Sequence, residues 1–265
     1  MKKETFSFCA DDATCNTTAD SNNSAISPSP INPKPWPPAG VKPYYSDSHT
    51  CIILGDCRDI LPTLEPVDLV LTDPPYGIDY DTSHSKYKNG ISRSEIIGDK
   101  GPFDASHLPL LGDCILWGGN CFFSSLPASS TWLVWVKIAR NNANIRQSDC
   151  ELAWSNCIGR SRVFNHLWIG AYKASESGQR AEHPTQKPVI LMRWCLALKP
   201  DARLILDPYM GSGTTLRAAK DLGRKAIGIE IEEKYCEIAA KRMSQSVLDF
   251  GSQPVKSEQT QLIIK

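Results

Sequence analysis

The stretch that decides the fold is residues 204–230, which read LILDPYMGSGTTLRAAKDLGRKAIGIE. An apolar run predicts a buried strand, two glycines make a turn, a helix is predicted to start at Thr214, and a second apolar run ends at Glu230. This order is typical of a nucleoside-binding βαβ unit, in which the acid accepts hydrogen bonds from ribose hydroxyls. We therefore predict a cofactor site made of the loop and the acid: Asp207, Pro208, Tyr209, Gly211, Ser212, Gly213, Thr214 and Glu230.

A second motif, Asp73-Pro74-Pro75-Tyr76, follows the apolar run at 67–71. Proline has no N–H for a sheet ladder, so the strand must end and Asp73 is placed at the carboxyl edge of a sheet, where open α/β proteins bind ligands. The Asp73 carboxylate and the Pro74 carbonyl can accept the N–H bonds of a planar amino group while the Tyr76 ring stacks on its heterocycle. Stacking gives the Tyr76 hydroxyl no role. The alternative is a strand-ending turn with a capping aspartate.

The remaining apolar runs extend this pattern to a whole domain. Seven strands are predicted, at 50–54, 67–71, 113–117, 132–136, 151–155, 203–207 and 226–230. Helices are predicted between them, at 58–64, 188–198, 214–222 and 232–243. Strands alternating with helices favour an α/β fold with a doubly wound, mostly parallel sheet. Because both motifs end strands, they can meet at a topological switch point without a second domain.

Composition sets limits on compartment and partners. Lys and Arg together number 29, as do Asp and Glu, so the whole-chain charge gives no sign of nucleic-acid binding. The ten cysteines form no Cys-x-x-Cys pair, so no metal site is predicted. Cys51, Cys114 and Cys195 lie in apolar runs and are interpreted as small buried side chains in a reducing compartment. No apolar segment follows the basic start or reaches membrane-spanning length, so we expect a cytoplasmic protein and no membrane partner.

Two segments have the composition of DNA-contacting loops. Residues 77 to about 108 lack helical or strand periodicity directly after the Asp73 motif, which favours a flap that closes over DNA against a poorly ordered surface loop. Residues 137–180 hold seven basic and three acidic side chains, which favours phosphate contact against an ordinary solvated surface. We predict DNA contacts within 77–112 and 138–182 from Lys86, Lys88, Arg93, Arg140, Asn142, Arg146, Arg160 and Arg162.

With these motifs in this order, the chain resembles the S-adenosylmethionine-dependent amino-methyltransferases of DNA. It is most similar to their circularly permuted β group, in which the Asp-Pro-Pro-Tyr segment precedes the cofactor loop. Residues 183–188, His-Pro-Thr-Gln-Lys-Pro, match the family pattern, and Lys137 completes its Trp-x-x-Trp-x-Lys strand. The resemblance covers about Cys51 to Arg242 and implies a Rossmann-like methyltransferase fold with S-adenosylmethionine as cofactor.

The resemblance also implies roles for single residues. Asp56, with Cys57 beside it, matches an acid near the cofactor adenine, although Asp56 is equally suited to capping the helix that follows. His183, Thr185 and Lys187 match residues at the methionine end of the cofactor. Aspartate at position 73 favours adenine N6 as the acceptor over cytosine N4, for which the family more often has serine. The sequence also leaves open a non-catalytic DNA- or cofactor-binding relative and methyl transfer to RNA or a protein amide.

The domain limits follow from composition and resemblance together. Residues 1–45 are rich in Ser, Asn and Pro and are predicted to form a loose arm, anchored by Trp36 and the pair Tyr44-Tyr45. Residues 46–243 form the predicted methyltransferase domain, and 244–265 a tail. Double-stranded DNA is the predicted partner. A homodimer, a cognate restriction enzyme, a solitary or phage-borne enzyme and the recognition sequence are left open.

Overall fold

A nine-stranded sheet forms the centre of the computed structural model, which describes residues 35–79, 97–110, 112–129, 131–138, 148–169, 172–176 and 186–245. The strand order is β1-β2-β11-β10-β3-β4-β6-β5-β7. The strands are β1 (Tyr45–Ser46), β2 (Thr50–Leu54), β3 (Leu69–Thr72), β4 (Cys114–Trp117), β5 (Thr131–Val136), β6 (Cys150–Ser155), β7 (Arg162–Asn165), β10 (Leu204–Asp207) and β11 (Lys225–Glu230). A separate antiparallel pair consists of β8 (Trp168–Ile169) and β9 (Tyr172–Lys173).

The central strands run parallel, and two neighbours reverse the direction. β2, β11, β10, β3 and β4 pair in parallel along this order, and β5 is parallel to β7. β6 lies antiparallel between β4 and β5, and β1 is antiparallel to β2. The first residues of β6 therefore lie at the same edge of the sheet as the last residues of β4 and β5. This edge carries the candidate site.

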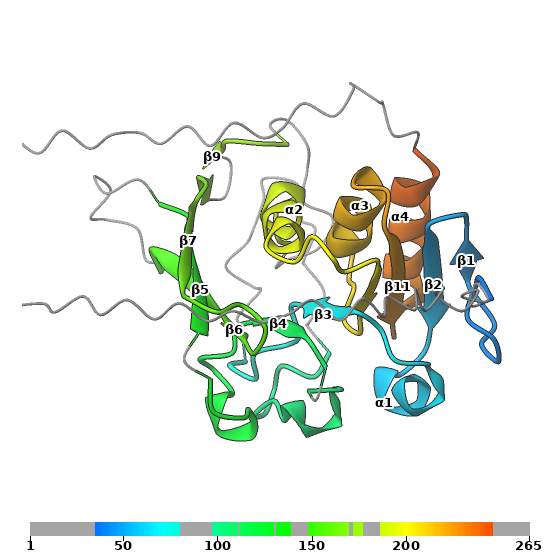
Figure 1. Ribbon diagram of the computed structural model, residues 1–265, viewed down its shortest axis with the longest axis horizontal. Coiled ribbons are helices and arrows are strands. Elements are labelled where there is room, and N and C mark those ends of the chain that lie inside the picture. Colours follow the sequence, from blue (N-terminus) through cyan, green and yellow to red (C-terminus); the bar gives the residue numbers. More distant parts are fainter. Residues whose placement is uncertain are drawn as a thin grey trace, which may run out of the picture. The chain divides into compact units, whose positions relative to one another are not determined.

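Helices cover the two faces of the sheet unequally. α2 (Val189–Ala197), α3 (Thr214–Asp221) and α4 (Glu233–Ser244) lie side by side over one face (Figure 1). The other face is covered by α1 (Cys57–Ile60) and the 3-10 turns η1 (Leu61–Thr63), η2 (Ala105–His107) and η3 (Phe123–Ser125). Within the described ranges, the three long helices thus cover one face of the sheet, and only short helical segments cover the other.

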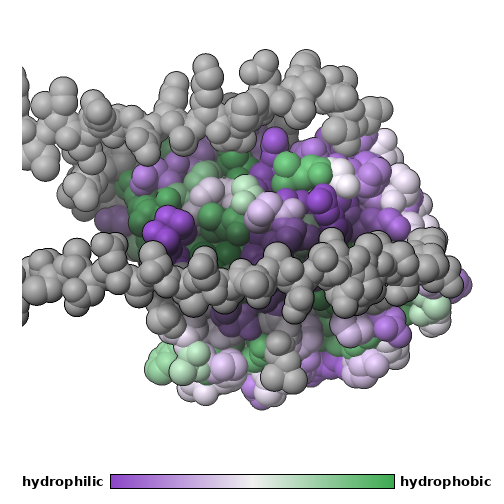
Figure 2. Space-filling model, viewed as in Figure 1, coloured by the Kyte–Doolittle hydropathy of each residue, from purple (hydrophilic) through white to green (hydrophobic). Residues whose placement is uncertain are grey.

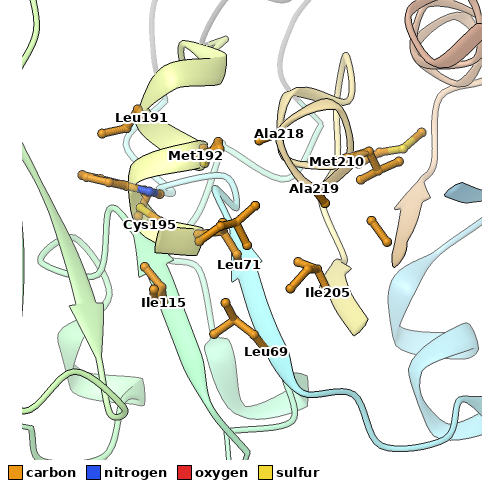
Figure 3. Packing of buried hydrophobic residues seen from close by; sticks show 14 of the residues in the cluster. Leu69, Leu71, Ile115, Leu191, Met192, Cys195, Ile205, Met210, Ala218 and Ala219 are labelled. Atoms are coloured by element: carbon orange, nitrogen blue, oxygen red, sulfur yellow. The ribbon is translucent and has the colours of Figure 1, made fainter. Parts of the chain in front are cut away.

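The main core lies between the sheet and the three long helices. Leu69 and Leu71 of β3 point toward α2 and α3, as Figure 3 shows, and both are fully buried. Alternate residues of β3 face the opposite side, where Val70 belongs to a second cluster. Because both faces are covered, these strands are continuous apolar runs instead of an alternating pattern.

All seven predicted strands are confirmed within two residues of their predicted bounds, but the predicted count of seven is wrong. The sheet gains β1 and β7. β1 is only two residues long and follows a proline-rich stretch, so the sequence shows no apolar run or alternation that would predict a strand there. β7 carries the exposed residues Arg162 and Asn165 at the edge of the sheet, in a segment whose composition predicts a DNA-contacting loop.

The described part of the predicted arm packs on the domain. The Trp36 indole N–H donates to the Asp47 carbonyl at 2.7 Å, and the Tyr45 hydroxyl donates to the Asp47 carboxylate at 3.0 Å. Tyr44 is more exposed, at 39%. Residues 1–34 and the tail beyond Gln245 lie outside the described residues, so these parts of the predicted arm and tail stay predictions.

The distribution of apolar residues and cysteines follows the position of the sheet and its covering helices. Figure 2 shows apolar residues gathered over the region of α2 and the neighbouring strands, with hydrophilic residues around them. Cys51, Cys114 and Cys195 are fully buried, as predicted. Across the described ranges no helix is long and apolar enough to cross a membrane.

Candidate functional site

The two sequence motifs meet at one edge of the sheet. β3, which ends before Asp73, pairs directly with β10, which ends at Asp207. The Thr72 hydroxyl donates to the Asp207 carboxylate at 2.6 Å and joins the two strand ends. From β10 the chain continues through α3 to β11 on one side, whereas β4 lies on the other side of β3. The predicted meeting at a topological switch point is confirmed.

Asp207 is a buried acid that ties the two motifs together. It is 3% exposed, and the backbone N–H of Tyr209 donates to it at 3.2 Å. Burial raises the pKa of Asp207 to about 6, against the opposing effect of the hydrogen bonds from Thr72 and Thr215. Its contacts are with the ends of β3 and the start of the loop, so Asp207 fixes the base of this edge.

The polar groups of Asp73, Tyr76 and Lys187 form a closed ring of hydrogen bonds. The Tyr76 hydroxyl donates to Asp73 Oδ1 at 2.7 Å. Lys187 Nζ donates to Asp73 Oδ2 at 2.6 Å and to the Tyr76 hydroxyl oxygen at 3.1 Å. Burial raises the pKa of Asp73, although the Lys187 ammonium opposes this shift. The alternative of a strand-ending turn with a capping aspartate does not account for this largely buried ring.

Tyr76 and Lys187 have contacts that the sequence did not predict, and their predicted roles at the base and the cofactor stay predictions. The Tyr76 hydroxyl, which stacking leaves without a role, is bonded to the Asp73 carboxylate. Lys187, predicted from the resemblance to line the methionine end of a cofactor, has its ammonium on Asp73 and only 5% of its side chain exposed. His183 and Thr185 lie outside the described residues, so the cofactor contacts of this segment stay predictions.

Glu151 is a site residue that the sequence reasoning missed. Its carboxylate pairs with Lys187 at 3.1 Å and with Lys137 at 2.6 Å. Burial opposes its ionisation, but Lys187 and Lys137 lower the pKa of Glu151 to about 2. An acid inside the otherwise apolar β6 was a usable signal, because a charge buried without a partner is costly.

The predicted cofactor loop is compact and bound to the end of β11. Gly211 donates its backbone N–H to the Glu230 carboxylate at 3.0 Å, and Glu232 donates to the same carboxylate at 2.8 Å. Gly213 precedes α3 with a φ of 79°, a left-handed conformation that favours glycine. The Ser212 hydroxyl donates to the side-chain oxygen of Gln186 at 3.1 Å. The predicted residues Pro208 and Thr214 are buried in this loop.

Aromatic rings lie beside the other end of this loop. The Tyr209 hydroxyl is 2.7 Å from a ring nitrogen of His107, and the Tyr209 ring meets the Phe103 ring edge to face at 5.6 Å. The Cys57 thiol interacts with Tyr209 as well. Phe103, His107 and Tyr209 thus form a cluster of rings packed edge to face, close to the end of β10.

Asp56 caps α1, which settles one of its two predicted roles. Its carboxylate accepts from the backbone N–H of Arg58 at 2.9 Å and pairs with the Arg58 guanidinium, which lowers the pKa of Asp56 to about 2. Contact with a cofactor adenine is compatible with the cap and stays a prediction.

The predicted DNA-contacting residues are only partly placed. Lys86, Lys88, Arg93, Arg140, Asn142 and Arg146 lie outside the described residues. Arg160 and Arg162 are exposed, and neither forms an ion pair with any residue that the structure describes. Their contact with phosphates remains a prediction.

The segment after Tyr76 is held by a buried acid. The Asp99 carboxylate, 5% exposed, accepts backbone N–H bonds from Gly77 at 2.8 Å and Ile78 at 3.3 Å. The Asp79 N–H donates to the Asp99 carbonyl at 2.8 Å. These bonds fix the backbone immediately beyond the Asp73 motif. No cluster of ligands suited to a metal ion occurs among the described residues.

Comparison with known proteins gives a consistent result. Residues 132–241 match the DNA methylase family of N6 and N4 methyltransferases. The type II methyltransferase M2.LlaDCHI of Lactococcus lactis subsp. cremoris is 46% identical over 260 residues, covering 77% of this chain and 93% of that protein. The type II methyltransferase M.HinfI of Haemophilus influenzae is 25% identical, covering 77% of this chain and 71% of its own length.

A solved structure supports the fold alone. The PvuII DNA methyltransferase, described as cytosine-N4-specific, superposes with a TM-score of 0.53 at 19% sequence identity. The match covers 79% of this chain and 91% of that one.

Proposed function

This chain belongs to the DNA methylase family of N6 and N4 methyltransferases, and from that premise we propose that it transfers a methyl group from S-adenosylmethionine to the N6 amino group of adenine at a specific site in double-stranded DNA. The observation that carries the proposal is the meeting of the Asp73 motif and the glycine loop at the ends of β3 and β10, joined by Thr72 and Asp207. This adjacency would bring a methyl donor and an amino acceptor together.

The residues present fit S-adenosylmethionine. We infer that the Glu230 carboxylate, at the end of β11 beside Gly211, holds the ribose hydroxyls of the cofactor, as in other nucleoside-binding βαβ units. The aromatic group of Phe103, His107 and Tyr209 suits the adenine ring. When bound, the cofactor supplies a methyl group activated by its sulfonium charge. The motif order, with Asp73 before the glycine loop, supports a circularly permuted member of the family.

The chain's own groups act on the acceptor nitrogen. The lone pair of N6 is delocalised into the adenine ring, which makes it a poor nucleophile. Hydrogen bonds from N6–H to the Asp73 carboxylate and the Pro74 carbonyl would draw electron density onto nitrogen and favour tetrahedral geometry. The residues here orient the amino group and need no covalent intermediate with the protein.

Adenine is proposed over cytosine because position 73 is aspartate. Incubation of the protein with unmethylated DNA and S-adenosylmethionine, followed by mass spectrometry of the digested nucleosides, is expected to yield N6-methyldeoxyadenosine. A product consisting of N4-methyldeoxycytidine would replace the proposed acceptor, and the absence of any methylated nucleoside would remove the proposed reaction.

We further propose a cytoplasmic site of action and a cognate restriction enzyme in the same cell, since two relatives are type II methyltransferases.

Glu230→Ala is expected to weaken S-adenosylmethionine binding by roughly 1–3 kcal/mol, because it leaves polar partners unpaired. The substitution also removes the hydrogen bond that the Gly211 backbone N–H donates to the Glu230 carboxylate at 3.0 Å. Calorimetric titration measures the effect, with the exposed neighbour Glu233→Gln as a control that should bind like the parent. Unchanged affinity in Glu230→Ala would mean that the ribose is held elsewhere.

Tyr76→Phe is expected to separate base binding from turnover. The target base must leave the duplex to reach Asp73, and 2-aminopurine at that position should brighten when protein and a non-reactive cofactor analogue bind. Phenylalanine keeps the ring and hence the stacking, which is worth about 1–3 kcal/mol per base. It loses the hydroxyl bond to Asp73, so kcat should fall while the fluorescence change persists. Full turnover in Tyr76→Phe would show that this bond has no catalytic importance.

A further inference from the structure

The Lys187 ammonium is held by three acceptors, one for each of its N–H groups. They are the Asp73 carboxylate at 2.6 Å, the Tyr76 hydroxyl oxygen at 3.1 Å and the Glu151 carboxylate at 3.1 Å. The ammonium also lies 5.3 Å from the centre of the Tyr76 ring. With Lys187 only 5% exposed, this is a built arrangement, unlike a surface ion pair.

Glu151 anchors this arrangement to the sheet. It is the second residue of β6 and pairs in register with Trp135 of β5, which fixes its position at this edge of the sheet. Its other oxygen accepts from Lys137 Nζ at 2.6 Å, immediately beyond the end of β5. The four charges form a chain, Asp73–Lys187–Glu151–Lys137, with two carboxylates and two ammonium groups.

We propose that Glu151 and Lys187 are positioning residues for methyl transfer, which hold the Asp73 carboxylate and the Tyr76 ring in the orientation that receives the target base. The inference rests on the proposed function. Neither residue is required to touch the base: Lys187 fixes Asp73 Oδ2 and the Tyr76 hydroxyl, and Glu151 fixes Lys187. The remaining lone pair of Asp73 Oδ1, which already accepts from the Tyr76 hydroxyl, then faces the acceptor amino group in a set direction.

Because Glu151 and Lys187 carry opposite charges, they shift the pKa of Asp73 in opposite directions. The titratable groups that face Asp73 are Lys187, Tyr76, Glu151 and, through Thr72, Asp207; Lys137 and Cys121 face Glu151 from its other sides. Burial raises the pKa of Asp73, Lys187 lowers it and Glu151 raises it. Removal of the Glu151 charge should therefore lower the pKa of Asp73, and removal of the Lys187 charge should raise it.

The test compares Glu151→Gln with Lys187→Met. Methyl transfer requires ionised Asp73, so kcat is lost as the pH falls through the pKa of that group. We expect this acid limb to move to lower pH in Glu151→Gln and to higher pH in Lys187→Met. At neutral pH kcat of Glu151→Gln should fall about 100-fold, the effect of a small misplacement of reacting groups, with the Kd for S-adenosylmethionine unchanged.

Matched controls come from ion pairs elsewhere in the fold. Glu237→Gln removes an exposed carboxylate paired with Lys241 at 2.8 Å on α4, and Lys199→Met removes an ammonium paired with Asp113 at 2.8 Å before β4. Both should keep the parental pH profile and kcat. Shifts of the same sign in Glu151→Gln and Lys187→Met, or no shift in either, would overturn the proposal.

A direct titration keeps the inference separate from the proposed function. Carboxyl-carbon NMR of the free protein, with the Asp73 signal assigned through Asp73→Asn, measures its pKa without any methyl transfer. A lowered pKa in Glu151→Gln supports the coupling, and an unchanged pKa overturns it, even if Lys187→Met does not fold. A parent protein that methylates no DNA would remove the proposed function, whereas an active parent whose Glu151→Gln variant is equally active would remove only the positioning role.

Discussion

Asp73→Ala is expected to abolish methyl transfer to DNA while S-adenosylmethionine still binds with nearly parental affinity. The carboxylate is the proposed acceptor of the N6–H bond, and the loss of one such preorganised group costs about 100- to 1,000-fold in kcat. Asp73 lies at the end of β3, whereas the proposed ribose-binding acid, Glu230, ends β11, with β10 between them. Incorporation of labelled methyl groups into DNA and calorimetric titration of the cofactor measure the two effects.

The structure allows a close control for Asp73→Ala. Lys187 loses one acceptor but keeps the Glu151 carboxylate at 3.1 Å, so the buried ammonium is still paired. Asp73→Asn keeps the shape and removes only the charge, and it should be nearly as inactive as the alanine variant. Substantial turnover in either variant, with the folded state verified by its melting temperature, would remove the mechanism.

Much of the fold could be predicted because the sheet is covered on both faces. Strands such as residues 69–72 are entirely buried and hence appear as uninterrupted apolar runs between turn residues. β7 could not be found in this way, since Arg162, Val163 and Asn165 are exposed at the edge of the sheet. Its position depends on pairing with β5, which is a long-range contact that a local pattern does not contain.

The site was predictable where it follows the ends of parallel strands. Asp73 and Asp207 were located because an apolar run stops directly before or at each of them, and adjacency of β3 and β10 then brings them together. Glu151 stands near the beginning of its strand. Since β6 is antiparallel, its beginning lies at the same edge, and only the strand direction reveals this.

Lys187 has a contact that its motif did not predict, the bond from its ammonium to the Asp73 carboxylate. Through the resemblance, the matched segment at 183–188 places Lys187 at the methionine end of the cofactor, and this role stays a prediction. Its partner depends on the approach of that segment to Asp73, across more than a hundred residues of sequence, and no spacing rule contains this information.

Gly118→Ala is expected to reduce kcat by about 100-fold or more, because the Tyr76 ring occupies the space that the new methyl group needs. A Cβ at Gly118 would lie 2.0 Å from Tyr76 Cε1 and 2.3 Å from Cδ1. Gly118 directly follows β4 and is held by a 2.8 Å bond from its N–H to the Leu152 carbonyl, so the backbone has little freedom to retreat. The ring must move instead, and its hydroxyl would then leave Asp73 and Lys187.

The φ of Gly118 is 73°, which adds a conformational cost of about 1–2 kcal/mol for alanine that is independent of Tyr76. Gly223→Ala separates the two effects, since Gly223 has a φ of 65° and no atom within 4 Å of the added Cβ. Both variants should melt at lower temperature than the parent, but only Gly118→Ala should lose turnover and the brightening of 2-aminopurine. Parental kcat in Gly118→Ala, or an equal loss in Gly223→Ala, would show that contact between Gly118 and Tyr76 does not set the geometry of the acceptor site.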